Sequence, residues 1–502
     1  MAPPPPPLLL LLIPFLLSLL SNPAIAKTEI QSDGPQGFIS AMISEKGLVF
    51  VKDLLIQQAL SSLTPLHLPK IQKSIKIPFL GGVHVSLSNI TLSQINVSSS
   101  VIKPGDTGVV IVASGATANM SMDWRYSYST WLIPVDISDK GRAFIQVEGM
   151  EVGITIKMKN QEGSLKLNLS ECGCYLKDIS ITLDGGASWF YQGLVDAFEG
   201  QIISAVENAI TKKIKEGIVR LDTFLQELPK EVPVDDIAAL NVTFMNDPLL
   251  RNSSVGFDIN GLFTTVPKVA TLNYHLTNSQ HSAFCKAPLK MLWISLDEAV
   301  LNSASDTYFQ AGIMTWTVDK VPEQSLLNTA GWKYIVPQLY KKYPNDDMQL
   351  NITSTSPPRI LVAPDKIGAS VTLDMVIEVL DANEIIPVAC LSMDISASGF
   401  VEISGNNLAG EAGLDDFTLT LKWSKVGNFH MYLVQTVVRV FLKDVALPYV
   451  NSHLKKGFPL PIIRGFTLTD ASIACTYSRI VVCSDVVFSD SFNVKRLPRK
   501  YW

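Results

Sequence analysis

Apolar residues recur every four and then every three positions between residues 189 and 228. They are Leu194, Phe198, Ile202, Val206, Ile210, Ile214, Ile218, Leu221 and Leu225. This spacing places them on one face of an α-helix, which Pro229 ends. The predicted helix is about three times as long as the average globular helix. It therefore requires an equally long partner surface, which the neighbouring strands can supply.

The residues before this helix predict a shorter helix followed by an antiparallel meander. A helix is predicted over residues 39–63, because apolar residues recur there with a period close to 3.6 and Pro65 follows. The period then changes to two, around residues 83–87, 150–158 and 165–169. Apolar residues that alternate with polar or small ones are typical of half-buried antiparallel strands.

The second half of the chain repeats this order. A helix is predicted over residues 323–343, with Leu327, Ile335 and Leu339 facing inward. Strands are predicted at residues 371–379, 395–403 and 417–423, and a second long helix over residues 429–454. The order of helix, strands and long helix therefore appears twice.

The length of the chain also favours two domains. A chain of 502 residues is too long for one hydrophobic core, since cores stop growing at roughly 250 to 300 residues. We predict an N-terminal domain at residues 37–264 and a C-terminal domain at residues 289–490. Residues 265–288 have weak periodicity and contain Pro267 and Pro288, which indicates a linker.

Composition and charge exclude several classes of protein. Apolar residues make up 47% and charged residues 17% of the chain, which excludes a disordered protein. Residues 27–265 carry 20 Lys and Arg against 25 Asp and Glu, and the remainder balances at 21 against 21. A nucleic-acid-binding domain normally presents a basic face, so no nucleic-acid partner is expected.

The N-terminus predicts secretion. Residues 8–20 are an apolar run, and Ala24, Ile25 and Ala26 form a small-x-small cleavage pattern, so residues 1–26 are interpreted as a signal peptide. A retained anchor is the alternative, but Pro14 interrupts the run, which is shorter than the roughly 20 residues that a span needs. A secreted chain can carry N-glycans, and sequons occur at Asn89, Asn96, Asn119, Asn168, Asn241, Asn252 and Asn351.

The cysteines predict structural roles. Cys475 and Cys483 lie at equal distance from Arg479, so a hairpin that turned there would place them opposite each other and favour a disulfide, although sequence alone does not set connectivity. Cys172 and Cys174 form CxC rather than the CxxC of a redox or zinc site. No metal site is expected.

Enzyme motifs are absent from the sequence. It contains no G-x-S-x-G, H-E-x-x-H, P-loop or dinucleotide-binding motif. The six histidines are scattered, and none has a second His or Cys at a metal-ligand spacing. We therefore predict no catalytic residues and a protein that is not an enzyme.

Three lysines are the candidate polar site. Lys70, Lys73 and Lys76 follow the first predicted helix at a spacing of three. They can present a small cationic surface to phosphate head groups. The alternative interpretation is a solvated helix end.

Four short segments carry a family resemblance. They are ISEKGL at residues 43–48, VEGM at 147–150, STSPP at 354–358 and KGFPLP at 456–461. In this order, between about residues 37 and 487, they resemble the family of bactericidal/permeability-increasing protein and lipopolysaccharide-binding protein (BPI/LBP). The acidic balance of the first half is similar to that of the plant members.

The resemblance implies an α+β fold, a two-domain boomerang in which each domain is a long helix wrapped by a highly twisted antiparallel sheet, with a central sheet between the domains. It also implies an apolar lipid pocket in each domain and no cofactor other than bound phospholipid. The candidate pocket residues are Val51, Leu55, Ile202, Val206 and Ile210 in the first domain and Val437 and Phe441 in the second. Relatives join the region of Cys172 and Cys174 to a helix cysteine, but an ungapped count puts Thr211 at that position.

Three functions remain open from the sequence. The first is recognition of bacterial lipopolysaccharide (lipid A) in innate defence, with Lys70, Lys73 and Lys76 at the head group. The second is a carrier or transfer protein for phospholipid or another host lipid, and the third is an extracellular scaffold or adhesion protein. The expected partners are lipopolysaccharide or phospholipid and microbial or lipid-aggregate surfaces. The expected location is extracellular, in the apoplast or cell wall for a plant protein, and the oligomeric state stays open.

Overall fold

The computed structural model describes residues 37–77, 81–129, 136–184, 188–265, 274, 290–321, 323–364, 366–382 and 384–489. The predicted signal peptide, residues 1–26, lies outside the described residues. So does the predicted linker, residues 265–288, apart from Thr265 and Tyr274.

An antiparallel sheet forms the greater part of the N-terminal half. Its strands follow the order β2 (Leu66–His67), β4 (Gly81–Asn96), β6 (Gly108–Ser129), β7 (Asp136–Gln161) and β8 (Ser164–Tyr175), while β3 (Ile71–Ile77), β5 (Ser99–Gly105) and β9 (Asp178–Asp184) pair with β4, β6 and β7. The predicted strands at residues 83–87, 150–158 and 165–169 are therefore confirmed. Register shifts between Ala113 and Ala118 interrupt the β6–β7 ladder, and such bulges bend a sheet.

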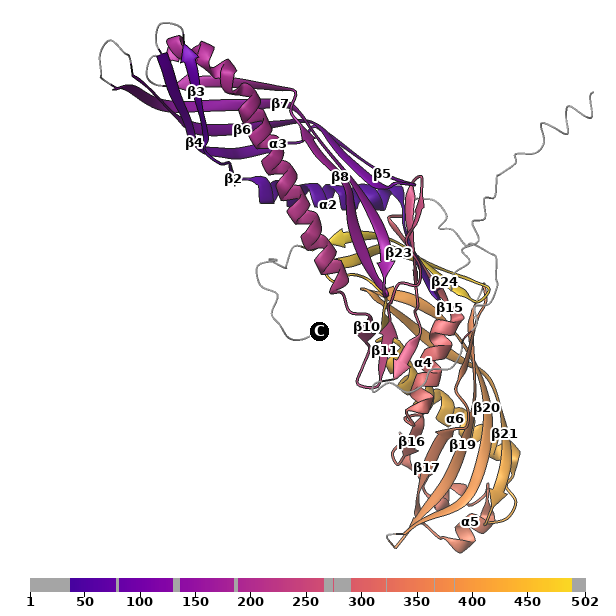
Figure 1. The fold of residues 1–502 in the computed structure, drawn as a ribbon. Coiled ribbons are helices and arrows are strands. Elements are labelled where there is room, and N and C mark those ends of the chain that lie inside the picture. The colour runs from indigo at the N-terminus through magenta and orange to yellow at the C-terminus, as the bar shows by residue number, and fades with distance from the viewer. Residues whose placement is uncertain are drawn as a thin grey trace, which may run out of the picture. The chain divides into compact units, whose positions relative to one another are not determined.

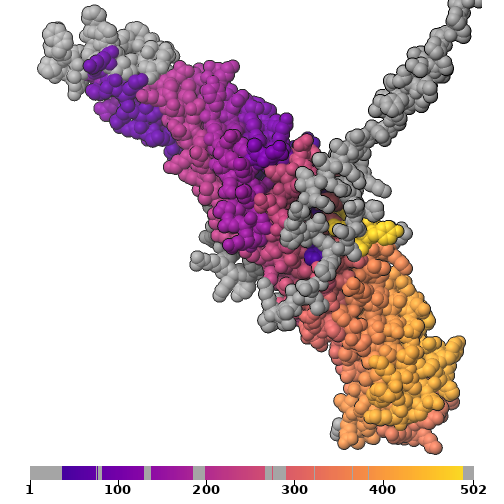
Figure 2. Space-filling model, turned by 45° about the vertical axis from the view of Figure 1, so that its right-hand side comes forward, coloured from indigo at the N-terminus to yellow at the C-terminus, as the bar shows by residue number. Residues whose placement is uncertain are grey.

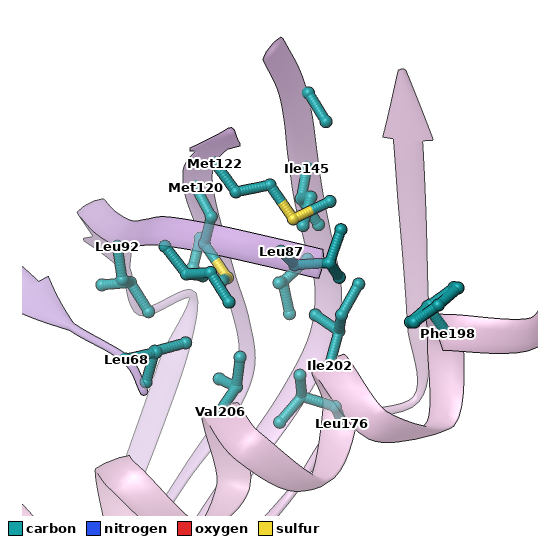
Figure 3. Packing of buried hydrophobic residues seen from close by; sticks show 14 of the residues in the cluster. Leu68, Leu87, Leu92, Met120, Met122, Ile145, Leu176, Phe198, Ile202 and Val206 are labelled. Atoms are coloured by element: carbon teal, nitrogen blue, oxygen red, sulfur yellow. The ribbon is translucent and has the colours of Figure 1, made fainter. Parts of the chain in front are cut away.

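Helix α3 (Ser188–Gln226) runs along this sheet, as its apolar period predicts (Figure 1). Its buried face carries Phe198, Ile202, Val206 and Ile210. Figure 3 shows the first three pointing toward strand residues that include Leu87. Each large apolar side chain that this contact buries contributes about 1.5 to 3 kcal/mol, which explains how a helix of 39 residues is held.

Helix α2 (Glu45–Leu63) begins later than the sequence pattern suggested. The prediction of helix from residue 39 is wrong, because Ile39–Ile43 form strand β1. The boundary is set by Ser44, whose backbone is extended and whose side chain accepts a hydrogen bond from the Gly47 amide as an N-cap. Gly47 is required there, since a Cβ would lie 2.4 Å from the Met291 carbonyl oxygen.

A central sheet draws strands from both halves of the chain. Its order is β12 (Leu249–Arg251), β13 (Ser254–Ile259), β1, β15 (Leu292–Asp297), β24 (Arg479–Phe488) and β23 (Phe466–Thr476). A small sheet of β10 (Glu231–Pro233), β11 (Ala238–Asn241) and β14 (Phe263–Thr265) lies before the gap in the described residues. The expected central sheet is confirmed, because β1 pairs with β13 on one side and β15 on the other.

The C-terminal half has a second large antiparallel sheet. Its order is β16 (Thr315–Val318), β17 (Asp347–Ser354), β19 (Ile367–Asp381), β20 (Glu384–Ser404), β21 (Asn407–Ser424) and β22 (Phe458–Pro459), and β18 (Arg359–Val362) pairs with β19. The three predicted strands of this half are confirmed and extend further than the pattern indicated. Two curled antiparallel sheets with few helices give the α+β class that was expected.

The long helix of the C-terminal half contains a π-helical turn. It consists of α6 (Met431–Phe441), the π turn η3 (Leu442–Ala446) and α7 (Leu447–Leu454). Val434, Val438 and Phe441 are buried against the sheet. The predicted helix over residues 429–454 is therefore confirmed, apart from the change of helical type in its middle.

The predicted helix over residues 323–343 is wrong. The segment forms two 3-10 turns, η1 (Gln324–Leu327) and η2 (Thr329–Trp332), and the short helix α5 (Pro337–Lys342). The Asn328 side chain accepts a hydrogen bond from the Ala330 amide and starts η2, and Pro337 lacks the amide that a continuing helix needs. Leu327 and Leu339 are nevertheless buried, as predicted.

Helix α4 (Glu298–Gln310) was not predicted. Its buried face holds Asn302, Ser303, Ser305 and Thr307, so the apolar period is weak. The Asn302 side chain bonds to both the Ile360 carbonyl (2.9 Å) and the Ile360 amide (2.9 Å), which replaces apolar packing by hydrogen bonds to β18.

The predicted disulfide between Cys475 and Cys483 is wrong. Cys483 is disulfide-bonded, but Cys475 is free. The β23–β24 hairpin forms, but it turns at Tyr477 and Ser478 rather than at Arg479. Cys475 therefore pairs with Ile480, and Cys483 lies opposite Ser472. Ser478 adopts a φ of 60°, which makes this turn tighter than the assumed one.

Candidate apolar ligand sites

Three of the predicted pocket residues lie in a close-packed core. Ile202, Val206 and Ile210 of α3 are at most 1% exposed and pack among residues of β4, β6 and β7. A core of this density leaves little space for a ligand. These three side chains anchor the helix on the sheet.

The packing loosens further along the same helix. Ile214, Leu221 and Leu225 continue the inward stripe of α3 but are only half-buried, and Ile218 is buried between them. Farther along β7, the half-buried residues Ile154 and Met158 lie beside the buried residue Ile156.

Two separate apolar clusters meet at this looser region. One contains Leu48 of α2 with Val109 and Ile111 of β6, and the other contains Ile218 of α3 with Leu165 and Leu167 of β8. Ile154, Met158 and Phe257 contact both clusters and are only partly buried. We call these three residues the seam.

The seam has the properties of a site for an apolar ligand. Its side chains pack inward on both clusters yet keep partial access to solvent. Sites of this kind are lined mainly by apolar side chains and bury most of the ligand surface. Leu55 of α2 packs against the first cluster, so this predicted residue lies beside the seam. Val51, one turn earlier on α2, is half-buried.

Sequence reasoning missed the three seam residues. Ile154 and Met158 lie in the alternating run of residues 150–158, which marked the strand but not its degree of burial. Phe257 lies on β13, which follows α3 in the chain and belongs to the central sheet. A complete list of inward positions on the predicted strand would have included Ile154 and Met158, but no strand was predicted at Phe257.

The C-terminal half encloses an apolar void of about 20 Å³. The predicted residues Val437 and Phe441 line it, together with Val321, Leu326, Leu327, Trp332, Leu350, Met375 and Val438. Every lining residue is apolar, and the Trp332 ring nitrogen donates to the Leu326 carbonyl (2.9 Å). The void is as large as one or two water molecules, but it offers no polar partner to hold them.

An aromatic stack leads from this void to the surface. The Phe441 ring centroid lies 6.0 Å from that of Trp316, and the Trp316 ring stacks on Tyr449 at 4.8 Å. Tyr449 is 50% exposed. The π turn η3 separates Phe441 from Tyr449 in the chain, and such turns are frequent at functional sites.

The three candidate lysines do not form one surface. Lys70 precedes β3 and is exposed, and Lys76 is exposed on β3. Lys73, also on β3, is half-buried, and its ammonium lies 5.8 Å from the Phe198 ring centroid. Residues three apart on a strand point to opposite faces, so Lys73 and Lys76 do not share one face of β3.

The two cysteines of β8 are free and face α3. The Cys172 sulfur lies 4.0 Å from the Thr211 carbonyl oxygen, which supports the sequence-based alignment of these two positions. Burial, with smaller contributions from Glu207 and Cys172, raises the pKa of Cys174 to about 12. A thiol of such high pKa is a poor nucleophile at neutral pH.

Tyr308 and Asp235 form a structural pair. Tyr308 donates a 2.7 Å hydrogen bond to Asp235. Burial raises the pKa of Tyr308, and this hydrogen bond raises it further.

Within the described ranges, no three His, Cys, Asp or Glu side chains lie close enough together to hold a metal ion. Among those same residues, no helix is both long and apolar enough to cross a membrane.

The predicted sequons differ in exposure. Asn241 is half-buried and accepts hydrogen bonds from the amide and hydroxyl of Thr243. Asn351 is half-buried in β17, and its side-chain oxygen is buried without a hydrogen-bond partner among the described residues. The others are exposed: Asn89, Asn96, Asn119, Asn168 and Asn252.

The fold and these sites define a class of protein in which a long helix covers a curved antiparallel sheet twice in one chain. The chain belongs to the LBP/BPI/CETP family: the N-terminal domain of that family matches residues 47–227 and the C-terminal domain matches residues 232–488. It is 54% identical to a BPI/LBP family protein of Arabidopsis thaliana, over 95% of this chain and 97% of that protein.

More distant relatives have descriptive names. The chain is 27% identical to the bactericidal permeability-increasing protein of Sebastes schlegelii, over 90% of this chain and 95% of that protein. It is 23% identical to the lipopolysaccharide-binding protein of Bos taurus, over 85% of this chain and 89% of that protein. A crystal structure of lipopolysaccharide binding protein superposes with a TM-score of 0.63 at 20% identity and covers 91% of this chain and 100% of that one, which shows a shared fold.

Proposed function

We propose that this protein is a secreted, non-enzymatic lipid-binding protein that holds acyl chains at the seam and in the C-terminal void. The observation that carries the proposal is the seam, where inward apolar side chains of two clusters remain partly exposed. An apolar surface of this kind is stabilised when a ligand covers it.

Apolar burial supplies most of the holding free energy. Burying one methylene group contributes about 0.8 kcal/mol, so a chain of about 14 carbons taken from water gains roughly 11 kcal/mol before other costs. Lipids arrive from aggregates in which their chains are already out of water, so the net gain on transfer is near zero. Selectivity therefore depends on the shape of each site and on polar groups that contact the lipid head group.

The C-terminal void has to enlarge to accept a chain. Its volume of about 20 Å³ corresponds to a few atoms. Met375 in its wall is unbranched and adapts to different neighbours, and Leu326 belongs to a short 3-10 turn. We expect these two side chains to move apart when an acyl chain enters between β19 and α6.

The proposed ligand is lipid A of bacterial lipopolysaccharide, recognised in innate defence. The names of the animal relatives support this choice. Lys70 and Lys76 are exposed and can approach phosphate groups of a lipid aggregate, although β3 lies at the opposite end of β6 from the seam. A second candidate is a carrier of host phospholipid, which is favoured by the half-buried position of Lys73 and by the net charge of −5 of the whole chain.

Mass spectrometry of lipids that co-purify with the natively expressed protein tests the proposal. Lipid A or phospholipid in the extract supports lipid binding and separates the two candidates. An extract without lipid, together with no binding of added lipid A or phosphatidylcholine, would contradict it and favour the extracellular scaffold or adhesion role.

Two matched substitutions on β7 test the seam. Met158→Trp places a large ring where the two clusters meet, whereas Lys157→Trp places the same ring at the preceding residue, which is exposed. We expect the first to reduce the bound lipid per protein at least about fivefold and the second to leave it unchanged. Equal lipid content in both variants would exclude the seam as the site.

A charge reversal tests the head-group site. Lys70→Glu with Lys76→Glu should weaken lipid A binding at least about tenfold, since each charge near an anionic surface contributes about 1 kcal/mol. Lys341→Glu with Lys342→Glu, two lysines of α5 in the other half, is the charge-matched control. If Lys70→Glu with Lys76→Glu still bound lipid A with unchanged affinity, these two lysines would be excluded from the head-group site.

Secretion and glycosylation belong to the same proposal. We expect glycans at exposed sequons such as Asn168 and Asn252, and none at Asn351, whose side-chain oxygen is buried. Peptide mass mapping before and after glycosidase treatment measures each site. A protein without any glycan and with residues 1–26 retained would contradict secretion.

A further inference from the structure

The long helix of the C-terminal half presents an unusual outer face. Six of its apolar or aromatic residues are at least 39% exposed: Tyr432, Leu433, Val440, Tyr449, Val450 and Leu454. Scattered exposed apolar residues are ordinary, but these six are concentrated in one helical stretch, and we call them the exposed patch. In Figure 2 the gold part of the C-terminal half, to which this stretch belongs, lies at the surface.

The charge of this stretch differs from that of the chain. Residues 431–456 contain Arg439, Lys443, Lys455 and Lys456 against one acid, Asp444, whereas the whole chain has a net charge of −5. Arg439 lies over the Phe417 ring, and Lys455 pairs with Glu411 at 3.4 Å. Lys443 is exposed in the π turn. The patch is therefore locally cationic.

The inner face of the same helix lines the apolar void. Val437, Val438 and Phe441 form part of its wall. The void and the exposed patch are thus separated by one helix, and the Phe441, Trp316 and Tyr449 rings connect them.

We propose that the outer face of residues Met431–Leu454 is a docking surface for an anionic lipid bilayer, from which a lipid reaches the void beneath the helix. This inference rests on the proposed lipid-binding function. Exposed Tyr, Leu and Val side chains enter the boundary between head groups and acyl chains, and cationic side chains at the same level attract anionic lipids. A protein partner would not require the cationic excess.

Vesicle cosedimentation tests this surface with the full-length protein. The probes are vesicles of phosphatidylcholine alone and of phosphatidylcholine mixed with phosphatidylglycerol. We expect stronger binding to the mixed vesicles, and Lys443→Glu should reduce that binding several-fold. Equal binding to both vesicles, or no effect of Lys443→Glu, would overturn the electrostatic part of the inference.

A matched pair of double variants tests the apolar part. Leu433→Glu with Val440→Glu changes the proposed surface, and Val219→Glu with Phe224→Glu changes exposed apolar residues of α3. The first pair should bind mixed vesicles at least about tenfold less, and the second should bind like the unchanged protein. If both double variants lost vesicle binding equally, or if Leu433→Glu with Val440→Glu lost none, the proposed docking surface would be wrong.

Hydrogen exchange on the unchanged protein gives a test that does not depend on folding of a variant. Mixed vesicles should slow exchange in peptides of residues 431–456 and leave peptides of α4, residues 298–310, unaffected. If exchange slowed only in peptides outside residues 431–456, the inference would be wrong. Lipid loading from detergent micelles reports on the proposed function separately, since it requires the internal sites but no bilayer surface.

Discussion

The Lys46 ammonium lies 2.8 Å from Asp485 Oδ1, although 439 positions separate the two residues in the chain. Lys46 stands in the first turn of α2, and Asp485 is on β24 at the other end of the sequence. Lys290 also donates to Asp485 (3.3 Å) and to Asp470. These ion pairs join the start of the N-terminal half to the last strands of the central sheet.

Asp485→Asn should lower the free energy of unfolding by on the order of 1 to 2 kcal/mol at neutral pH. Burial alone would raise the pKa of Asp485, but hydrogen bonds from Lys46, Lys290 and the Met291 amide lower it overall. Because the folded pKa is below the unfolded one, this stability is present above the unfolded pKa of about 3.9. It is lost as pH falls through the folded pKa.

Urea unfolding of the unchanged protein and of Asp485→Asn at pH 7 and pH 3 measures this effect. The difference between the two proteins should shrink at the lower pH. Asp178→Asn, at an exposed position of β9, is the control and should be nearly neutral. A difference that is independent of pH would contradict the ionic explanation.

Ile202→Ala should destabilise the protein by about 2 to 5 kcal/mol, because Ile202 is fully buried between α3 and the sheet and its truncation leaves a cavity. Val219→Ala on the same helix, at a residue 64% exposed, should change stability by less than about 0.5 kcal/mol. Thermal unfolding measures both. Similar values for the two variants would contradict the assigned helix face.

Thr211→Cys should form a disulfide with Cys172, because the Cys172 sulfur already lies 4.0 Å from the Thr211 carbonyl oxygen. A bridge across a loop of this length stabilises by on the order of 3 to 4 kcal/mol in the chain-entropy description. Without reductant the melting temperature should exceed that of the unchanged protein, and with reductant the two should be equal, so that the effect of the disulfide of Cys483 cancels. Thr211→Cys combined with Cys172→Ser is the control and should respond to reductant as the unchanged protein does.

Cysteine alkylation under denaturing, non-reducing conditions should separate Cys475 from Cys483. Cys475→Ser removes a free thiol, so the count of alkylated cysteines should fall by one. Cys483→Ser breaks a disulfide and releases its partner, so the count should rise by one. The intact mass of each alkylated variant gives its number of alkylated cysteines. A rise of one in both variants would restore the sequence-based disulfide.

The sequence alone determined the elements that depend on long, regular periods. The stripe of α3 and the alternation in β4, β7 and β8 arise from local spacing, since one face of each must be apolar to pack. Tight local features were harder. Asn328 and Pro337 divided a predicted helix, and α4 was missed because its buried face is polar.

The candidate site depended on tertiary structure to a greater degree. Leu55, Val437 and Phe441 were candidates that the family resemblance implied. Ile154, Met158 and Phe257 form the seam because separate clusters meet there. Lys73 does not belong to the predicted lysine surface, because β3 is a strand, in which successive side chains alternate between the two faces.

What the sequence by itself determined about this protein is its family, its α+β class and the apolar faces of its two long helices, because these follow from short-range order along the chain. Only the tertiary structure decided how tightly each apolar face is covered and which cysteines, lysines and ion pairs meet. Lys46 and Asp485 are the clearest example, since their contact depends on the pairing of strands from both ends of the chain.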